Sequence, residues 1–213
     1  WWVRTFPQAE FKYVNAGIGG TTSQFGVARA QDDLLDAEPD FVIAEFSVND
    51  ESTGHFEETY EGLVRKILSS KSHPALMLVH NVCYNNGASA ELVHSRIARH
   101  YNIPSVSMQS TLYKALLNCR FDNRRITPDD LHPNDCGHEL VSMVITKRLE
   151  QIKNTVKAEY ETAKSQRAAA QPDAGAAALL PEPLTANAYE DSVRYQNYNS
   201  TPELDGFKAD MSE

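Results

Sequence analysis

The chain has 213 residues, 41% of them hydrophobic, which is enough for one sizeable core but hardly for two full domains. Its formal net charge of -9 argues against nucleic acid or an anionic membrane surface as a default partner, because both require a basic face. No apolar run in the sequence approaches the roughly 18 residues of a membrane span. The sequence leaves the compartment and the oligomeric state open.

Taken in chain order, strand patterns alternate with helix patterns. Residues 1–6 would finish a helix that Pro7 closes, and then come a short strand over 11–14, a glycine-rich loop over 15–20 and a helix over 23–37. Residues 40–48 form a nearly continuous apolar run, which is typical of a parallel strand covered on both faces. The pattern continues with helix 56–68, strand 75–82, helix 88–100, strand 103–108 and helix 112–117. Alternation of this kind predicts an α/β fold with a parallel sheet and right-handed crossovers.

A long helix is predicted after residue 132, with an apolar stripe that would pack it on the sheet: Leu140, Val141, Val144, Ile145, Leu149, Ile152 and Val156. Past Lys157 the stripe disappears, so we expect the helix to project into solvent to about residue 170. Residues 171–183 are rich in Ala and Pro and indicate a linker. We therefore divide the chain into a main domain over 1–157, a helix extension and linker over 158–183, and 184–213 as a tail or the start of a further module.

The stretch from Thr127 to Asn134 carries the first chemical signal, because Asp129 lies three residues before His132. Acyl transfer needs a base that accepts the nucleophile's proton and a carboxylate that holds the imidazole in one tautomer. Asp129 and His132 are candidates for this pair. The alternative is an Asx turn leading into a helix that is capped by Asn134 or Asp135.

Two loops that follow predicted strands carry candidate donors for an oxyanion. Gly17, Gly19 and Gly20 permit a tight turn in which a backbone N–H points at an anion. A nucleotide-binding loop is the competing interpretation, although the spacing is not GxGxxG and no Lys-Ser/Thr follows. Asn49 has an amide that can donate to an oxyanion or simply serve a turn, and Asp50 beside it is interpreted as a cap or turn residue. Ligands of such sheets bind beyond the carboxyl ends of the strands, where these loops would lie.

The remaining histidines and the cysteines suggest no further site. We interpret His55, His73, His94 and His100 as surface residues, and His80 as a core histidine with satisfied hydrogen bonds. A metal site built from Asp129, His132 and His138 is conceivable, but the spacing is not a recognised ligand pattern. Cys83, Cys119 and Cys136 are odd in number and lack zinc-ligand or disulfide-framework spacing, so we interpret them as small core residues. We expect no metal and no cofactor.

The order of the motifs resembles the SGNH/GDSL family of esterases and lipases over about residues 10 to 150. NAGIGGTTS is similar to the second block of the family, FSVND to the third and DDLHPND to the last. The resemblance implies a three-layer α/β/α, flavodoxin-like fold. It also implies roles: the Gly20 backbone N–H and the Asn49 side chain as oxyanion donors, His132 as general base, and Asp129 as the acid that orients it.

The sequence departs from the family pattern in two places. Ser47 stands where the third block usually has Gly, and the first block, GDS with the nucleophilic serine, is absent. Ser23 and Ser47 lack the position of a nucleophile; we interpret Ser23 as a cap near a helix start and Ser47 as part of a strand. We therefore expect a piece of an esterase whose first strand and nucleophile are missing, with little or no activity by itself.

The prediction is a serine-dependent carboxylic ester hydrolase, with carbohydrate esters, O-acetyl groups in particular, or small esters as substrates. The alternatives are a non-catalytic module on the same fold that binds a glycan or an ester, and a flavodoxin-like nucleotide binder. Acyl and alcohol specificity stay open.

Overall fold

A computed structural model describes residues 1–167, 180–196 and 200, without the side chains of 163–167. Its centre is a parallel sheet of three strands in the order β1-β2-β3, formed by Phe41–Ala44, Ala75–His80 and Ser105–Ser107. Val42 pairs with Leu76, and Val79 pairs with Val106. The helices around the sheet are α1 (Trp2–Thr5), α2 (Ser23–Asp33), α3 (Gly54–Leu68), α4 (Glu91–His100), α5 (Lys114–Leu117) and α6 (Asp135–Arg167). Short helical turns lie at Leu35–Ala37, Gln109–Tyr113 and Asn123–Arg125.

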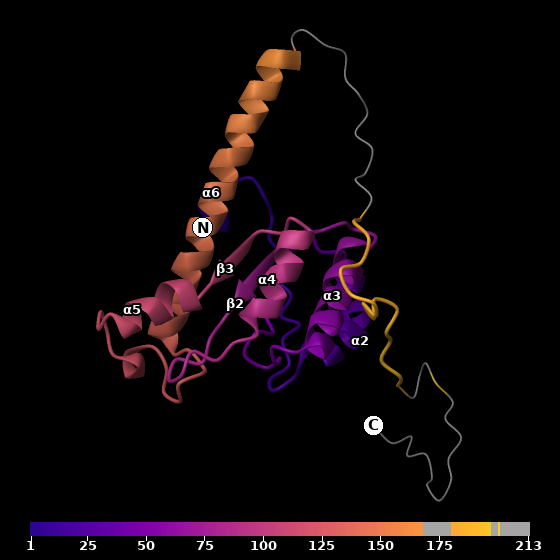
Figure 1. The fold of residues 1–213 in the computed structure, drawn as a ribbon. Coiled ribbons are helices and arrows are strands. Elements are labelled where there is room, and N and C mark those ends of the chain that lie inside the picture. Colours follow the sequence, from indigo (N-terminus) through magenta and orange to yellow (C-terminus); the bar gives the residue numbers. More distant parts are fainter. Residues whose placement is uncertain (168–179, 197–199, 201–213) are drawn as a thin grey trace, which may run out of the picture.

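Helices cover both faces of the sheet, as the apolar run of β1 and the strand pattern of β2 require (Figure 1). Leu76 and Leu78 of β2 face a core shared with α2, α3 and α4, whereas Val79 belongs to a second core lined by Leu140 and Val144 of α6. This is the predicted α/β fold with helices on either side of a parallel sheet.

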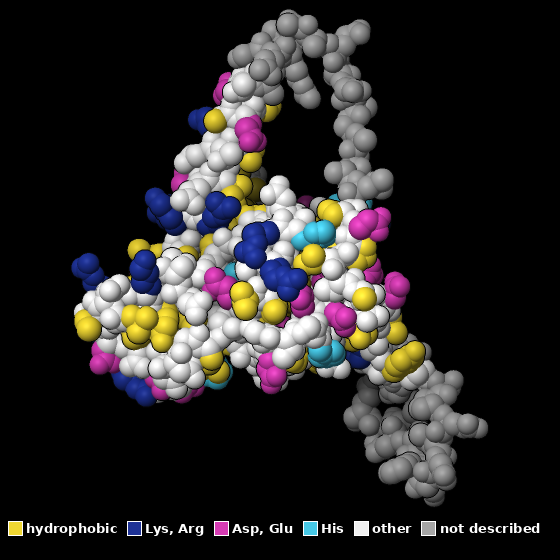
Figure 2. Space-filling model, viewed as in Figure 1, with side chains coloured by type: hydrophobic (Ala, Val, Ile, Leu, Met, Phe, Trp, Pro, Cys, Tyr) yellow, Lys and Arg dark blue, Asp and Glu magenta, His cyan; other side chains and the backbone are white. Residues whose placement is uncertain are grey.

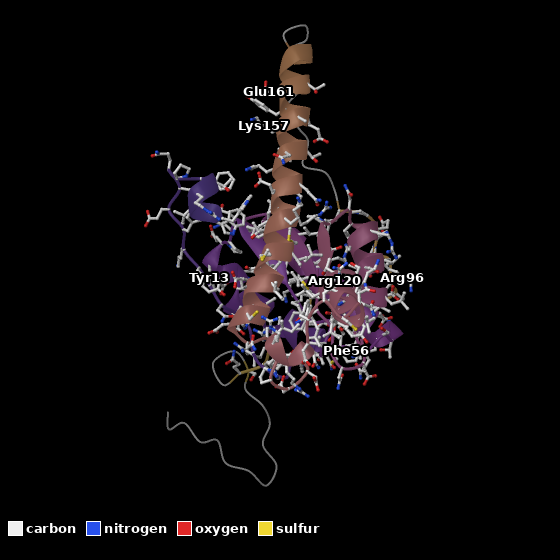
Figure 3. All side chains as sticks on the ribbon, turned by 90° about the vertical axis from the view of Figure 1, so that its left-hand side faces the viewer. Tyr13, Phe56, Arg96, Arg120, Lys157 and Glu161 are labelled. Atoms are coloured by element: carbon white, nitrogen blue, oxygen red, sulfur yellow. The ribbon has the colours of Figure 1, made fainter. Side chains whose placement is uncertain are left out.

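Helix α6 begins beside the sheet and then extends beyond it (Figure 1). Lys157 and Glu161 lie on its outer turns, away from the body of the molecule (Figure 3). Val156, the last residue of the predicted stripe, is already 56% exposed. The predicted end of the helix near residue 170 and most of the predicted linker lie outside the described residues, as do residues 197–199 and 201–213 of the tail.

The described segment 180–196, which we call the C-terminal strap, returns to the main body and lies along α3 (Figure 1). Glu61 of α3 is fully buried and accepts hydrogen bonds from the backbone N–H groups of Leu184 at 2.5 Å and Thr185 at 2.8 Å. Arg65 forms an ion pair with Glu190 at 2.7 Å. Charged side chains of α3 therefore hold the strap, and Arg194 of the strap adds an ion pair with Asp33 of α2 at 3.1 Å.

Three expectations about local structure are wrong. Residues 11–14 form no strand, and among the described residues no strand pairs with them. Ser47 lies in a turn rather than in a strand, because β1 ends at Ala44. Cys119 and Cys136 are exposed, the first in a turn after α5 at φ 53° and the second in the first turn of α6, while Cys83 is half-buried.

Among the described residues no helix combines the length and apolar character that crossing a membrane requires. On the face shown in Figure 2, acidic and basic side chains are interspersed.

Candidate active site

Asp129 and His132 form the pair that their spacing predicts. His132 Nδ1 lies 2.7 Å from Asp129 Oδ2, and Asp129 Oδ1 accepts the backbone N–H of His132 at 2.8 Å. The hydrogen bond from the His132 ring, followed by the backbone N–H donors, holds the pKa of Asp129 well below its usual range. An ionised Asp129 accepts the proton on Nδ1, which leaves Nε2 of a neutral His132 as a base. The His132 side chain is 74% exposed, so this base is open to a substrate.

The loop that carries this pair is closed by the start of α6. Asn134 Oδ1 accepts the backbone N–H of Gly137 at 3.0 Å, which is the bond of a helix N-cap. A Cβ on Gly137 would lie 2.2 Å from the carbonyl oxygen of Ile126, so only glycine fits there. The predicted Asn134 cap and the Asp129–His132 pair therefore occur together, and the turn and cap serve to position the pair.

Asn49 is exposed on a tight turn directly after β1. The backbone N–H groups of Asn49 and Asp50 both donate to the carbonyl of Phe46, at 3.1 and 2.9 Å. Beneath the turn, Ser47 N donates to Glu45 Oε1 at 2.8 Å, and Ser47 Oγ lies 2.9 Å from the carbonyl oxygen of Asn81. The turn is thus anchored to Glu45, which directly follows β1, and to the loop after β2.

Gly20 lies in an exposed loop just before α2, at φ 68°. A backbone in this left-handed region favours glycine, and a Cβ built at Gly20 meets no atom within 4 Å, so the position requires glycine for its conformation rather than for space. Two bonds shape the loop: Gly17 N donates to Asn15 Oδ1 at 3.0 Å, and Thr21 Oγ1 donates to the carbonyl of Ile18 at 2.8 Å.

Hydrogen bonds join these loops at one edge of the sheet. Asp50, next to Asn49, accepts the backbone N–H of Ser23 at the start of α2, at 2.8 Å. The loop after β2 contacts the turn of Asn49, because Ala90 N donates to the carbonyl of Ser47 at 2.7 Å. The same loop contacts the His132 loop, because Tyr84 N donates to the carbonyl of Asp130 at 2.7 Å. Among the described residues no hydrogen bond joins the Asp129–His132 pair directly to Gly20 or Asn49.

His94 is a correction to the sequence interpretation, because it is fully buried rather than on the surface. Its Nε2 lies 3.0 Å from Asp50 Oδ2, and its ring stacks on Tyr60 at 3.6 Å between centroids. The helical spacing of Ala90, Ile97 and Ala98, which are all buried, would have placed His94 on the inner face of α4. Asp50 is buried as well and bridges elements, a role that no local motif indicates.

His80 lies in the core as expected, but its hydrogen bonds are not satisfied. The residue is 1% exposed, and neither ring nitrogen has a hydrogen-bond partner among the described residues. Burial, with a smaller contribution from His94, lowers the pKa of His80 from 6.5 to about 4. The ring is therefore neutral at neutral pH.

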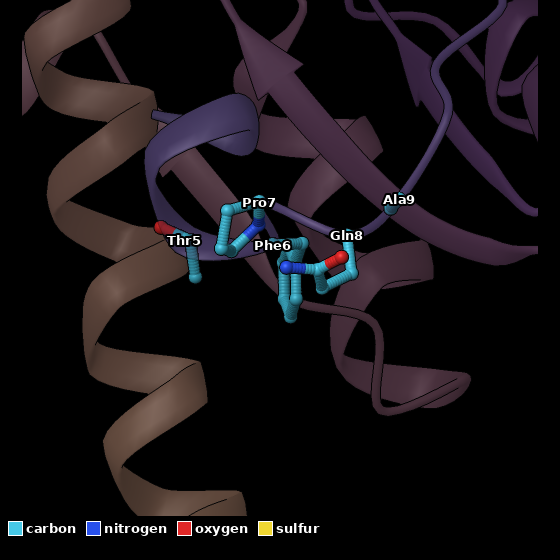
Figure 4. Close-up of a pocket in the computed structure, with 5 residues that line it drawn as sticks. All are labelled: Thr5, Phe6, Pro7, Gln8 and Ala9. Carbon is cyan, nitrogen blue, oxygen red and sulfur yellow. The ribbon is translucent and has the colours of Figure 1, made fainter.

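Two hollows lie away from these loops. A shallow one of about 450 Å³ is lined by Thr5 to Ala9 (Figure 4). An apolar one of about 500 Å³ lies between α1, the start of the sheet and α6, with Trp2, Phe41 and Ile152 among its walls. Neither is lined by the candidate catalytic residues. Among the described residues no group of three or more His, Cys, Asp or Glu side chains is arranged to hold a metal ion.

The fold and the ordered motifs define a class of protein, and a comparison with family models agrees. The chain belongs to the GDSL-like lipase/acylhydrolase family, whose model matches residues 1–140. A curated relative, thioesterase 1/protease 1/lysophospholipase L1 of Escherichia coli K12, is 26% identical over 158 residues, which cover 69% of this chain and 71% of the relative.

Among solved structures, a two-domain esterase active on acetylated mannans, crystallised with mannopentaose, is 59% identical with a TM-score of 0.84. The match covers 100% of this chain but only 52% of that esterase, so the chain spans about half the length of this relative. An acetylxylan esterase from Geobacillus stearothermophilus, Axe2, solved as a catalytic mutant, is 19% identical with a TM-score of 0.60 over 69% of this chain, which shows a shared fold.

Proposed function

We propose that this chain supplies the general base and the oxyanion donors of a serine-dependent carboxylic ester hydrolase that removes acetyl groups from a mannan-type polysaccharide. The observation that carries the proposal is the 2.7 Å contact between His132 Nδ1 and Asp129 Oδ2, with the imidazole open to solvent. The substrate class rests on the 59% identity to the esterase active on acetylated mannans.

In the proposed ester hydrolysis each of these groups acts at a defined step. His132 Nε2 takes the proton of a serine hydroxyl as its oxygen attacks the acetyl carbonyl, and Asp129 stabilises the imidazolium that forms. The Gly20 N–H and the Asn49 side-chain amide donate to the tetrahedral oxyanion. Collapse of the intermediate breaks the bond to the sugar oxygen, which takes the proton from His132. Water then attacks the acetyl-serine by the same route and releases acetate.

No serine of this chain is proposed as the nucleophile. Ser23 and Ser47 are both fully buried. Ser23 Oγ lies 2.7 Å from Thr59 Oγ1, and Ser47 Oγ lies 2.6 Å from Glu45 Oε1. Hydroxyls that are buried and hydrogen-bonded in this way are not accessible to a polysaccharide. We therefore expect the 213-residue chain alone to hydrolyse esters weakly or not at all.

The test compares the full-length product of the gene that encodes this chain with the 213-residue chain. Both are assayed for acetate release from acetylated glucomannan, from acetylated xylan and from para-nitrophenyl acetate, with His132→Ala as the inactive variant. His138→Gln is the matched control, because His138 is an exposed histidine near the same helix start. Labelling with a fluorophosphonate, followed by peptide mass spectrometry, identifies the nucleophilic serine.

We expect the full-length protein to release acetate fastest from the glucomannan, and His132→Ala to remove that activity while His138→Gln retains it. Full activity of His132→Ala would refute the assignment of the base. Binding of the polysaccharide without any acetate release or serine labelling would instead identify a non-catalytic binding module on the same fold.

A further inference from the structure

A buried carboxylate and imidazole connect the turn that carries Asn49 to the start of α2, just after the Gly20 loop. Asp50 is 6% exposed and His94 is 0% exposed, and Asp50 Oδ2 lies 3.0 Å from His94 Nε2. The other carboxylate oxygen, Oδ1, accepts the backbone N–H of Ser23 at 2.8 Å. One side chain on the turn after β1 thus contacts the start of α2 and the middle of α4.

Both oxyanion candidates lie close in sequence to this carboxylate or to the N–H group that it accepts. Asn49 immediately precedes Asp50, and the N–H groups of both residues donate to the carbonyl of Phe46, so the two residues share one turn. Gly20 lies three residues before Ser23, whose N–H the carboxylate accepts. A shift of the Asp50 carboxylate would therefore change the position of Asn49 relative to Gly20.

The position of His94 is fixed by its surroundings. Its ring is stacked on Tyr60 with an interplanar angle of 11°, and Tyr60 is itself fully buried. A carboxylate oxygen accepts hydrogen bonds, so in this contact His94 Nε2 is assigned as the donor. Among the described residues Nδ1 has no hydrogen-bond partner, which leaves the bond to Asp50 as the one that the ring makes. A buried carboxylate without such a donor is strongly disfavoured.

We propose that Asp50, held by His94, is a positioning residue that fixes the Gly20 loop and the Asn49 side chain at the separation that an oxyanion requires. The inference rests on the proposed function. Neither Asp50 nor His94 touches the substrate; both act through the loops that carry the oxyanion donors.

A double-mutant cycle separates positioning from mere core stability. In the full-length protein, His94→Phe keeps a ring against Tyr60 and removes the donor to Asp50, and Asn49→Ala removes one oxyanion donor. Rates are expressed per serine labelled at the end point by fluorophosphonate, so that unfolded protein is not counted. We expect His94→Phe to lower kcat roughly tenfold or more with KM little changed, because small displacements of catalytic groups are costly.

The same substitution made in Asn49→Ala is expected to lower kcat by only about two- to threefold, because residues that act through one group are not additive. His94→Gln, which keeps an N–H donor, should recover most of the rate. Glu61→Gln is the control: Glu61 is an equally buried charged group that contacts the C-terminal strap instead, so this variant should lower thermal stability and retain kcat. If His94→Phe does not fold, Asp50→Asn takes its place in the cycle.

A second readout does not depend on catalysis. Hydrogen exchange in the 213-residue chain should become faster in both 17–23 and 46–50 in His94→Phe, and in neither segment in Glu61→Gln. Additive losses in the cycle, or unchanged exchange in either segment, would overturn the positioning role while leaving the esterase assignment intact. If the full-length wild type released no acetate, the proposed function would fail, and the exchange experiment alone would decide whether Asp50 and His94 couple the two loops.

Discussion

Acidification should destabilise this protein through His80. The side chain is 1% exposed at the end of β2, and both ring nitrogens lack hydrogen-bond partners among the described residues. Burial lowers the pKa of His80 from 6.5 to about 4 in the folded protein. Between these two values the unfolded chain binds a proton that the folded protein does not bind. Stability therefore falls as the pH decreases from 6.5 to 4, and His80 contributes no slope above that window.

The size of the effect follows from the two pKa values. At pH 5 the unfolded chain is mostly protonated at His80 and the folded protein mostly is not, which costs about 2 kcal/mol relative to neutral pH. The full difference below pH 4 is about 3 kcal/mol. These are large fractions of the stability of a typical domain, which lies in the range of roughly 5 to 15 kcal/mol.

The assay is urea unfolding followed by tryptophan fluorescence at several values between pH 7 and pH 4.5, for the wild type and for His80→Phe. Phe keeps an aromatic ring of similar shape and removes two unsatisfied polar atoms, so we expect nearly unchanged stability at pH 7. At pH 5, His80→Phe should exceed the wild type by about 2 kcal/mol more than it does at pH 7. The exposed His138→Gln variant should follow the wild type. Parallel pH curves for His80→Phe and the wild type would show that His80 is not buried as a neutral ring.

Three further predictions concern the strap and the catalytic pair. Gly62→Ala would place a methyl carbon 1.5 Å from the carbonyl oxygen of Ala188, so limited proteolysis should cut the strap faster, whereas Gly54→Ala, whose added carbon meets no atom within 4 Å, should not change cleavage. Burial by itself would raise the pKa of Glu61, but the hydrogen bonds that its carboxylate accepts outweigh burial, so the net pKa lies below 4.5. Its contribution is therefore complete above about pH 4.5 and is lost as the pH falls below that value; Glu61→Gln should cost about 1–3 kcal/mol in urea unfolding at pH 7. Asp129→Asn in the full-length protein should lower kcat by about 10⁴-fold with KM little changed, since the amide favours the wrong tautomer of the histidine; equal rates in steady-state assays would contradict that role.

Much of the fold could be predicted from the sequence, because the spacing of apolar residues indicates which faces of each helix and strand are buried. The strand of 40–48 and the stripe of the last helix are examples, and their errors concern only where the elements end. Residues 11–14 show the limit of such reasoning: their composition suits a strand, but a strand forms only where a neighbouring strand offers hydrogen bonds, and composition does not report a neighbour.

The strap could not be predicted for a different reason. Its attachment depends on Glu61 of α3, which looks like a solvated helix residue until the segment 180–196 covers it. A charged residue is placed inside only when partners from elsewhere satisfy it. The partners that the strap supplies to Glu61 lie more than 100 residues further along the chain. The buried position of His94 is the same case on a smaller scale, because its partner Asp50 comes from another element.

The candidate active site has one part that local sequence specifies and one part that depends on nonlocal contacts. Asp129 and His132 are three residues apart, and the cap at Asn134 closes their loop, so local sequence specifies their 2.7 Å contact. Gly20 and Asn49 belong to separate elements, and no local rule specifies the distance between them. If an oxyanion requires both donors at once, that distance has to be set by a nonlocal contact. Asp50 belongs to the turn of Asn49, and its side chain contacts the start of α2 that follows the Gly20 loop. For this reason we expect substitutions in the Asp129–His132 loop to remove proton transfer selectively, and substitutions around Asp50 to lower the rate of the same step while the histidine pair stays formed.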